Sequence, residues 1–304
     1  MVMTSAIQPL ILCPGARRLR AALFLSGEGS NAARLLEQWS PDLAWEAVVV
    51  VTDRPETSRA AELAARYGVP LLGHDIRRFY QEHGENRVTL ATDHGRRLRE
   101  DWTAELRIRL APYRPDFGIL AGFVPLCNIT ADFPCLNVHP GDLTYLSDGR
   151  RYLVGLHQIP IERAMLAGLA SLRSSVILAQ PYTGGGHEEM DSGPLLGIST
   201  PVEIDLEGHD PEELQRIYDR RPDKKPASGY GDELERLARR HQERLKQDGD
   251  WVVFPAAVRD FAAGKFGLDK QRQLYFQDES VWRSVTTVEY DRQGHARPVP
   301  TATL

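Results

Sequence analysis

The chain is poor in cysteine, has no long apolar run and carries no excess of positive charge, and each shortage excludes a class of protein. Its three cysteines form no CxxC pair, which argues against a disulfide framework and a zinc site. No segment approaches the roughly 18 to 20 apolar residues of a membrane span. The net charge is −5 with both signs interspersed, so bulk nucleic-acid binding is not expected. We therefore expect a cytoplasmic protein with reduced thiols at Cys13, Cys127 and Cys135, two of them buried.

Strands and helices alternate in the first 75 residues. An apolar strand over 19–25 leads through a glycine turn into a helix over 32–38. A β-branched strand over 46–51 precedes a helix over 58–67, capped by Thr57 or Ser58 and ended by Gly68. A third strand follows over 69–72. This repeat predicts an α/β fold, an open, mostly parallel, Rossmann-like sheet with helices on both faces.

The later pattern continues this alternation and then changes character. Asp210 and Pro211 mark a helix start, and residues 220–231 are rich in Arg, Lys, Pro and Gly, as in a surface loop. Short β-rich pieces follow at 274–276 and 286–290. Further helices are expected over 89–111, 160–167, 233–246 and 254–263, and strands over 117–121, 134–140, 174–180 and 195–204.

The turn after the first strand has two interpretations. Its residues Gly27, Glu28, Gly29, Ser30 and Asn31 place backbone N–H groups at a helix N-terminus, where a phosphate could bind. The alternative is a plain strand-to-helix turn, which every doubly wound fold needs. A dinucleotide fingerprint is disfavoured, since alanine stands where the third glycine would be required.

Two polar side chains, Asn137 and His139, lie two residues apart on an otherwise apolar strand and therefore point to the same face. Taken singly, each has a structural interpretation as a strand-end cap or a packed histidine. Asp191 likewise sits in good turn chemistry, Asp-Ser-Gly-Pro. Together the three offer a hydrogen-bond donor, a proton carrier and a carboxylate, which predicts a catalytic site.

Several short segments carry a resemblance to a known family. They are Ser-Gly-Glu-Gly-Ser-Asn at 26–31, Leu-Ala-Gly-Phe at 120–123, Asn-Val-His-Pro at 137–140, Gly-Leu-His at 155–157 with Ala-Met-Leu-Ala-Gly at 164–168, and Met-Asp-Ser-Gly-Pro at 190–194. In order and spacing they resemble the folate-dependent formyltransferases, and most of all the phosphoribosylglycinamide formyltransferases. The likeness spans residues 19–266 with an insertion near 220–231. Residues 267–304 would be a C-terminal extension, packed on the same domain or at the interface of a homodimer.

The resemblance implies transfer of a formyl group from 10-formyltetrahydrofolate, as co-substrate, to an amine of a small acceptor, without a metal. By resemblance, Asn137 donates to the oxyanion and His139 is a second donor or the acid/base. Asp191 pairs with His139 and relays the proton. The implied folate site comprises Phe123, Val124, Pro125, Leu126, Cys127, Asp142, Glu188, Glu189 and Met190, and the acceptor site Gly27, Glu28, Gly29, Ser30, Asn31, Pro140 and Asp250.

Departures from the family pattern leave the acceptor open. Val124 and Pro125 replace a Met-Arg-like pair that touches folate in the family, and Arg173 replaces a histidine. The acceptor is thus a related or different amine, phosphorylated or sugar-like. A hydrolase of the same folate would use the same trio but normally carries an extra N-terminal domain, whereas about 18 residues precede the first strand. A non-catalytic folate- or nucleotide-binding module is the other alternative; transfer to a tRNA is disfavoured by the acidic charge.

Overall fold

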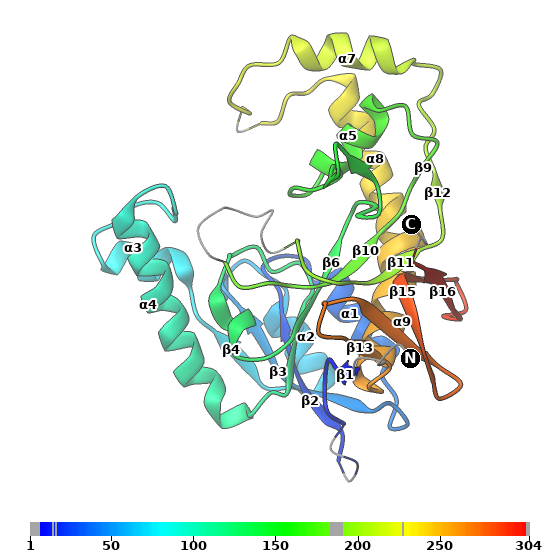
Figure 1. The fold of residues 1–304 in the computed structure, drawn as a ribbon. Helices are drawn as coiled ribbons and strands as arrows, with labels where there is room; N and C mark the ends of the chain where they lie inside the picture. The colour runs from blue at the N-terminus through cyan, green and yellow to red at the C-terminus, as the bar shows by residue number, and fades with distance from the viewer. Residues whose placement is uncertain (1–6, 14, 16, 183–190, 227, 302–304) are drawn as a thin grey trace. The chain divides into compact units, whose positions relative to one another are not determined.

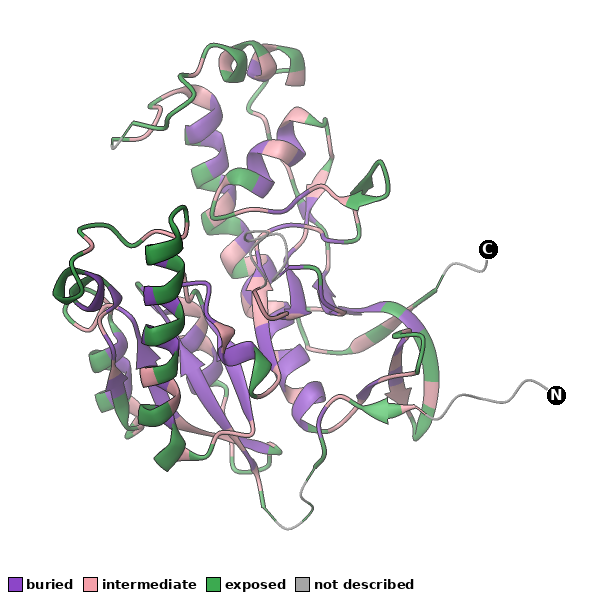
Figure 2. Ribbon diagram, turned by 60° about the vertical axis from the view of Figure 1, so that its left-hand side comes forward, coloured by how far each residue is buried: buried purple, intermediate pink, exposed green. Residues whose placement is uncertain are grey.

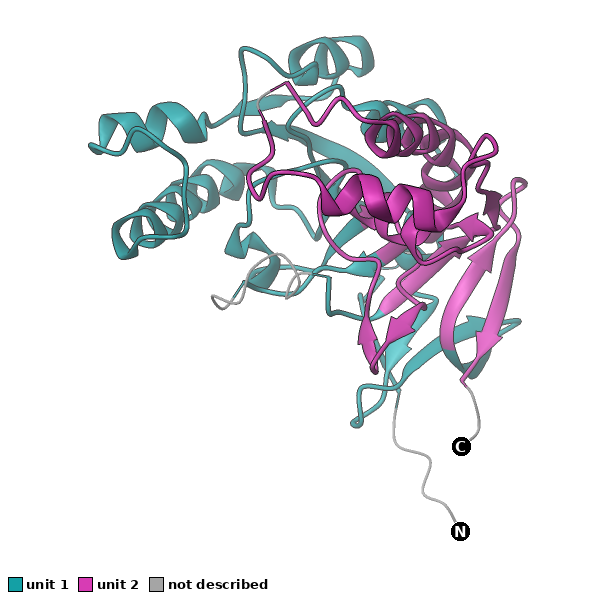
Figure 3. Ribbon diagram, turned by 90° about the horizontal axis from the view of Figure 1, so that it is seen from above, with its two compact units in different colours: residues 1–137, 177–194, 258–285 teal, residues 138–176, 195–257, 286–304 magenta. Residues whose placement is uncertain are grey.

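The computed structural model describes residues 7–13, 15, 17–182, 191–226 and 228–301 (Figure 1). The chain divides into two compact units, shown in two colours in Figure 3. Unit 1 comprises residues 1–137, 177–194 and 258–285, and unit 2 comprises residues 138–176, 195–257 and 286–304. One division falls inside strand β6 (Cys135–His139), between Asn137 and Val138. No helix in the described part of the chain is long and apolar enough to cross a membrane.

Unit 1 is built on parallel strands in the order β6, β5, β2, β3, β4. The central strand β2 pairs on one side with β3 and on the other with β5, with Leu23 opposite Val50 and Ile119. This arrangement brings the carboxyl ends of the strands to one edge, where ligands of such folds bind. The strands are β2 (Leu19–Phe24), β3 (Trp45–Thr52), β4 (Leu71–Gly73), β5 (Phe117–Leu120) and β6 (Cys135–His139).

Both faces of these strands are covered, as the unbroken apolar runs predict. Phe24 and Val51 share one core cluster with Trp102 of helix α4. The alternate residues, such as Leu23 and Val50, are also fully buried. In Figure 2 the strands are accordingly coloured as buried, while α4 shows an exposed outer side. The helices of unit 1 are α1 (Ser30–Glu37), α2 (Ala60–Tyr67), α3 (Ile76–Glu82) and α4 (Asp93–Leu110), with 3-10 turns η1 (Ala111–Tyr113) and η2 (Asn128–Ala131).

Unit 1 also contains an antiparallel part. Strands β14 and β15 form a hairpin whose two turn residues, Glu279 and Ser280, have positive φ angles of 46° and 68°. Such a turn matches the twist of paired strands. The strands are therefore longer than the short pieces expected from the sequence. They are β1 (Gln8–Pro9), β13 (Phe266–Leu268), β14 (Leu274–Asp278) and β15 (Val281–Tyr290), the last of which continues into unit 2.

Unit 2 buries a second apolar cluster among three helices, α5 (Ile159–Leu166), α7 (Pro211–Asp219) and α8 (Glu233–Leu245). Within it, β11 pairs in parallel with the end of β15, and β9 pairs antiparallel with β12. Helix α8 passes through a π-helical turn, η3 (Lys246–Asp250), into α9 (Trp251–Ala262). The other strands are β7 (Leu146–Ser147), β8 (Arg150–Arg151), β9 (Ser171–Leu172), β11 (Leu195–Ser199), β12 (Val202–Glu203) and β16 (Ala296–Pro300). Strand β10 (Ser175–Leu178) begins in unit 2 and ends in unit 1.

The predicted fold class, α/β with a mostly parallel open sheet, is confirmed, but several helix starts were wrong. Helix α2 begins at Ala60 after Arg59, because the hydroxyls of Thr52 and Ser58 bond to each other at 2.9 Å, so Ser58 does not cap the helix. Helix α4 begins four residues later than expected, where the Thr92 hydroxyl accepts from Gly95 N at 3.0 Å. Helix α9 starts at residue 251 rather than 254, since it continues from the π turn.

Helix α3 was not predicted, although its start has a clear cap. The Asp75 carboxylate accepts hydrogen bonds from the N–H groups of Arg77 and Arg78 at 2.8 and 2.9 Å. Its apolar residues Ile76, Phe79 and Tyr80 are buried and follow the helical spacing of three and four. The helix is only seven residues long, so its periodicity was too brief to detect.

The segment 220–231 of unit 2 is anchored by one buried cation. The Arg221 guanidinium donates to Glu162 of α5 at 2.7 Å and to Asp232, the N-cap of α8, at 2.7 Å. Its side chain is only 6% exposed, and it lies 4.1 Å from the centre of the Tyr230 ring. The described residues of this segment form no helix or strand, as predicted, yet the segment is fixed by this cluster.

Replacing Arg221 should therefore destabilise the protein. Arg221→Met leaves two partly buried carboxylates without their cation, which typically costs about 3–5 kcal/mol. The neighbour Arg220 is exposed and makes no ion pair among the described residues, so Arg220→Met should change stability by less than about 0.5 kcal/mol. Urea denaturation of both variants at neutral pH measures the difference, and equal stabilities would contradict the anchoring role.

The ion pair between Arg221 and Asp232 predicts that the stability of the protein depends on pH. The hydrogen bond from Arg221 holds the pKa of Asp232 below its ordinary value of about 3.9. A lowered folded-state pKa contributes stability above the unfolded-state value, and this contribution is lost as pH falls through the folded-state value. The Arg221→Met protein should consequently lose less stability between pH 5 and acid than the wild type does.

Candidate functional site

The glycine turn between β2 and α1 depends on one particular glycine. Gly29, the N-cap of α1, has a φ of 63°, in the left-handed region. A Cβ atom here would lie 2.7 Å from Cδ1 of Leu25 and 2.8 Å from Cδ1 of Leu63. A Cβ on Gly27 would meet nothing within 4 Å. The tight turn thus requires glycine at position 29 and leaves position 27 open.

The turn is joined to its surroundings by hydrogen bonds within unit 1. The carbonyl of Gly27 accepts from the N–H of Arg59 at 3.1 Å. The Ser26 hydroxyl accepts from the N–H of Val124 at 2.8 Å, which places the turn beside the loop that follows β5. Two segments that the resemblance assigned to different ligands, the acceptor turn and the folate loop, therefore adjoin. Glu28 is exposed and 3.8 Å from Arg59, so any anion at this turn would rely on the backbone N–H groups.

Asn137, in the middle of β6, meets Asp191, which is 54 residues away in the sequence. The amide Nδ2 of Asn137 donates to Oδ1 of Asp191 at 3.5 Å, at the long end of the hydrogen-bonding range. Asp191 is 7% exposed. The chain after it packs closely, since a Cβ on Gly193 would lie 1.9 Å from the Leu178 carbonyl. The glycine of the Asp-Ser-Gly-Pro turn is thus required by packing, and the carboxylate before it is held in place.

His139 lies in unit 2, where its ring is buried and oriented. Its Nε2 lies 2.7 Å from the carbonyl oxygen of Leu153. A carbonyl can only accept, so this bond assigns a proton to Nε2. Because His139 and Asp191 belong to different units, their expected pairing stays a prediction.

In unit 2, other predicted site residues are held by hydrogen bonds and ion pairs. Asp142 Oδ2 lies 3.7 Å from Nε of Arg173. The Nη1 atom of the same arginine donates to Glu289 at 2.5 Å. The arginine that replaces the family's histidine therefore bridges two carboxylates. Asp250, in the π-helical turn, is nearly buried and accepts from the Ser174 hydroxyl at 2.5 Å. π-Helical turns recur at functional sites. Pro140, in the same unit, is half-buried.

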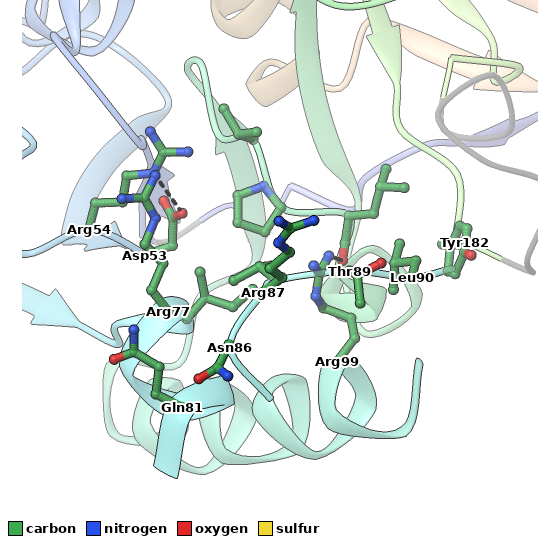
Figure 4. A pocket seen from close by; sticks show the side chains of 15 residues that line it. Asp53, Arg54, Arg77, Gln81, Asn86, Arg87, Thr89, Leu90, Arg99 and Tyr182 are labelled. Atoms are coloured by element: carbon green, nitrogen blue, oxygen red, sulfur yellow. Dashed lines mark hydrogen bonds and ion pairs between the residues drawn. The ribbon is translucent and has the colours of Figure 1, made fainter. Parts of the chain in front are cut away.

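A large pocket of about 910 Å³ opens in unit 1 beside the predicted folate loop (Figure 4). Val124, Pro125 and Leu126 line it, as the resemblance leads one to expect. The two flanking residues of the loop instead pack inward. Phe123 contacts Phe24 in an edge-to-face pair with ring centres 5.3 Å apart. Cys127 is buried, and burial raises the pKa of its thiol to about 11, so the thiol is unreactive at neutral pH.

The remaining lining of this pocket is rich in arginine. It carries four arginines, Arg54, Arg77, Arg87 and Arg99, against a single carboxylate, Asp53. Burial raises the pKa of Asp53, a shift opposed by the Ser26 hydroxyl and by Arg54, whose Nε lies 3.5 Å away. Asp53 can contribute at most one negative charge, which does not balance the positive charges of the four guanidinium groups. The pocket is therefore suited to an anionic ligand.

Sequence reasoning missed this arginine-rich lining because its arginines come from four elements. Arg54 follows β3 and Arg77 lies on α3. Arg87 lies in the segment between α3 and α4, and Arg99 lies on α4. In the sequence they are interspersed with acids. The detectable signal was the Asp75 cap of α3, which would have placed Arg77 on a helix.

Three residues of the expected folate site, Glu188, Glu189 and Met190, lie outside the described residues. Asn31 and Ser30, of the expected acceptor site, begin α1 and are half-buried. Within the described ranges, no three His, Cys, Asp or Glu side chains are grouped as metal ligands.

The two glycines of the turn give a matched test. Gly29→Ala should destabilise the protein by about 1–3 kcal/mol, because it combines a left-handed φ with two close contacts. Gly27→Ala should be within about 0.5 kcal/mol of the wild type. Thermal or urea unfolding of the purified variants measures both, and a stable Gly29→Ala protein would contradict this geometry of the turn.

Comparisons with known proteins bear on the fold. No family profile matches the chain, and no curated protein matches its sequence. Many solved structures are similar to it, among them the following three. Phosphoribosylglycinamide formyltransferase from Coxiella burnetii is 19% identical, with a TM-score of 0.56 over 90% of this chain and 100% of that one. The corresponding enzyme from Anaplasma phagocytophilum is 20% identical (TM-score 0.54; 90% and 99% covered), and glycinamide ribonucleotide transformylase 1 from Symbiobacterium toebii is 22% identical (TM-score 0.54; 86% and 96% covered).

Proposed function

We propose that this chain, which has the fold of the phosphoribosylglycinamide formyltransferases, transfers a formyl group from 10-formyltetrahydrofolate to an amine of a small acceptor. At about 20% identity the likeness establishes the fold, so the reaction must be argued from the site. The observation that carries the proposal is the contact of Asn137, in β6, with Asp191. Passive binding of a ligand does not require an amide donor and a buried carboxylate to meet there.

The reaction needs a donor for an oxyanion and a path for one proton. The amine attacks the formyl carbon, its oxygen becomes an oxyanion, and the C–N bond to the folate then breaks. Asn137 supplies the N–H donor, which is worth about 10²- to 10³-fold in rate at comparable sites. His139, oriented through Nε2 by Leu153, carries the proton at Nδ1. Asp191 stabilises the charged imidazole and passes the proton from the attacking to the leaving nitrogen.

The co-substrate would lie against the loop after β5. Val124, Pro125 and Leu126 supply apolar contact and line the basic pocket, and the carboxylates of the folate's glutamate would face its guanidinium groups. The proline at position 125 can offer no side-chain hydrogen bond. The Leu126 carbonyl already accepts from Arg99 at 2.6 Å, so the pterin must be recognised by other backbone groups.

The acceptor would bind at the glycine turn. The N–H groups at the start of α1 suit a phosphate, and the adjoining Ser26–Val124 bond keeps this turn beside the folate loop. The solved structures of this fold include enzymes of glycinamide ribonucleotide, an acceptor with one phosphate and one primary amine. Glycinamide ribonucleotide is therefore the first acceptor to assay.

Asp191→Asn tests the proposed chemistry. The amide keeps the size and the contact with Asn137 but cannot accept the proton, so turnover should fall by about 10²- to 10³-fold. The affinity for a folate should change less than about twofold. Formation of tetrahydrofolate, followed with and without glycinamide ribonucleotide, measures the rate.

The matched control is Asp132→Asn, which removes an exposed carboxylate of unit 1 that pairs with Arg107. It should leave turnover unchanged. A fully active Asp191→Asn enzyme would remove this carboxylate from the mechanism. Wild-type turnover that needs no amine would show a hydrolase instead.

Ser30→Glu tests the phosphate. Ser30 is the first residue of α1, where an added carboxylate favours the helix but repels an anion. One like charge at about 4 Å in water costs about 1 kcal/mol, so the KM for glycinamide ribonucleotide should rise about fivefold with kcat unchanged. Ser30→Gln, which adds the same bulk without charge, should have a smaller effect. Equal KM values for the two variants would place the phosphate elsewhere.

A further inference from the structure

The carbonyl that orients His139 belongs to a segment without regular backbone pairing. Residues 152–154 of unit 2 follow β8, precede α5 and form no helix or strand. The Leu153 side chain is fully buried in the apolar cluster of this unit, while its carbonyl oxygen lies 2.7 Å from Nε2 of His139. In a helix or strand, the regular backbone hydrogen bonds would fix such a carbonyl. Here the position of the Leu153 carbonyl depends on other groups.

Arg163, on α5, holds the carbonyls on both sides of Leu153. Its Nη1 atom donates to the Tyr152 carbonyl at 3.0 Å and to the Val154 carbonyl at 2.9 Å. A guanidinium nitrogen of this kind carries two N–H groups, so one atom can serve both carbonyls. The guanidinium also lies 5.7 Å from the centre of the Tyr152 ring. Two side chains therefore hold three consecutive carbonyls, Arg163 the outer two and His139 the middle one.

The charge of Arg163 is used on this segment and not on an acid. Among the described residues Arg163 makes no ion pair, whereas Glu162, next to it on α5, pairs with Arg221 at 2.7 Å. Hydrogen bonds from a guanidinium are stronger than those from a neutral donor. The helix beneath is well anchored, since Ala164 and Met165 are fully buried. Arg163 is thus a strong donor on a fixed support.

The backbone at Gly141 closes the other side of the same hydrogen bond. A Cβ atom at Gly141 would lie 2.5 Å from the carbonyl oxygen of Leu153 and 3.0 Å from Nε2 of His139. The Gly141 carbonyl accepts from the Ser175 hydroxyl at 2.7 Å, which fixes this backbone to β10. Glycine is therefore required at position 141, and substitution there disturbs the bond between His139 and Leu153 without touching Arg163.

We infer that Arg163 is a positioning residue for the proposed formyl transfer. By holding the carbonyls on both sides of Leu153, it keeps the Leu153 carbonyl against Nε2 of His139, and this bond fixes the tautomer and the orientation of the imidazole. Arg163 acts through the backbone and touches no reacting atom. Its effect on rate rests on the proposed function, whereas its effect on the His139 ring can be measured without any substrate.

Arg163→Met removes the two hydrogen bonds and keeps an apolar stem. Misplacing a reacting group by about 1 Å can cost about 100-fold in rate, so kcat for formyl transfer should fall by about 10- to 100-fold. The KM values for 10-formyltetrahydrofolate and glycinamide ribonucleotide should change less than about twofold, because no binding group is removed. Arg163→Lys, whose ammonium can donate to both carbonyls from a shorter side chain, should have a kcat between those of Arg163→Met and the wild type.

The His139 ring gives a second, direct measurement. NMR of protein with isotope-labelled histidine nitrogens, at a pH where the imidazole is neutral, should show the Nε2–H tautomer of His139 in the wild type and a mixture of tautomers in Arg163→Met. His139→Gln assigns the signal. Gly141→Ala should give the same mixture. The double variant of Arg163 and Gly141 should be hardly slower than the slower single variant, because both changes act through one bond.

Arg216→Met is the matched control. Arg216 is exposed on α7, which shares the apolar cluster of α5, and it makes no ion pair in the part of the chain that the structure describes. Its replacement should leave kcat and the His139 signal unchanged. Where Arg163→Met does not fold, Arg163→Gln provides the same two measurements.

A lower kcat of Arg163→Met with the wild-type His139 signal would show a merely structural role and overturn the inference. A wild-type kcat in that variant would overturn it as well. If the wild type transfers no formyl group but the His139 signal changes in Arg163→Met, the proposed function fails while the hold of Arg163 on the ring is supported.

Discussion

The parallel pairing of β2 with β3 and β5, buried on both faces, is the constraint on which the rest of unit 1 depends. A strand covered by helices on both sides must be apolar along its length, so polar groups are restricted to its ends. The carboxyl ends of β2 and β5 lead into the glycine turn and the loop that contains Val124, and Asn137 lies in the adjoining strand β6. One packing requirement thus concentrates the chemistry of this unit at a single edge.

Close backbone approach then defines that edge. Gly29 allows the turn to pass against Leu25 and Leu63, and Gly193 allows the chain after Asp191 to pass against the Leu178 carbonyl. In both places a side chain would displace a residue assigned to a ligand or to the reaction. The glycines therefore act on function by positioning, and the polar residues beside them need few contacts of their own.

The arginine side chains are arranged mainly by pairing with acidic residues. Most arginines near the surface are paired with acids close by in sequence or space, and Arg221 is paired even where it is buried. Among the described residues, three arginines of the pocket, Arg77, Arg87 and Arg99, depart from this rule, whereas Arg54 pairs with Asp53. Because the protein leaves their charge uncompensated, the proposed ligand completes the electrostatics of the fold.

The sequence by itself determined the α/β class, the order of β2, α1, β3, α2 and β4, and the motifs that suggested Asn137, His139 and Asp191, because hydrophobic period and turn chemistry are local properties. It also determined the Gly68 stop and the Asp210 cap, which the structure confirms. Only tertiary structure decided that Asn137 meets Asp191, that Arg173 bridges Asp142 and Glu289, and that four arginines share one pocket. These depend on distances between elements remote in the chain, and no local pattern encodes such distances.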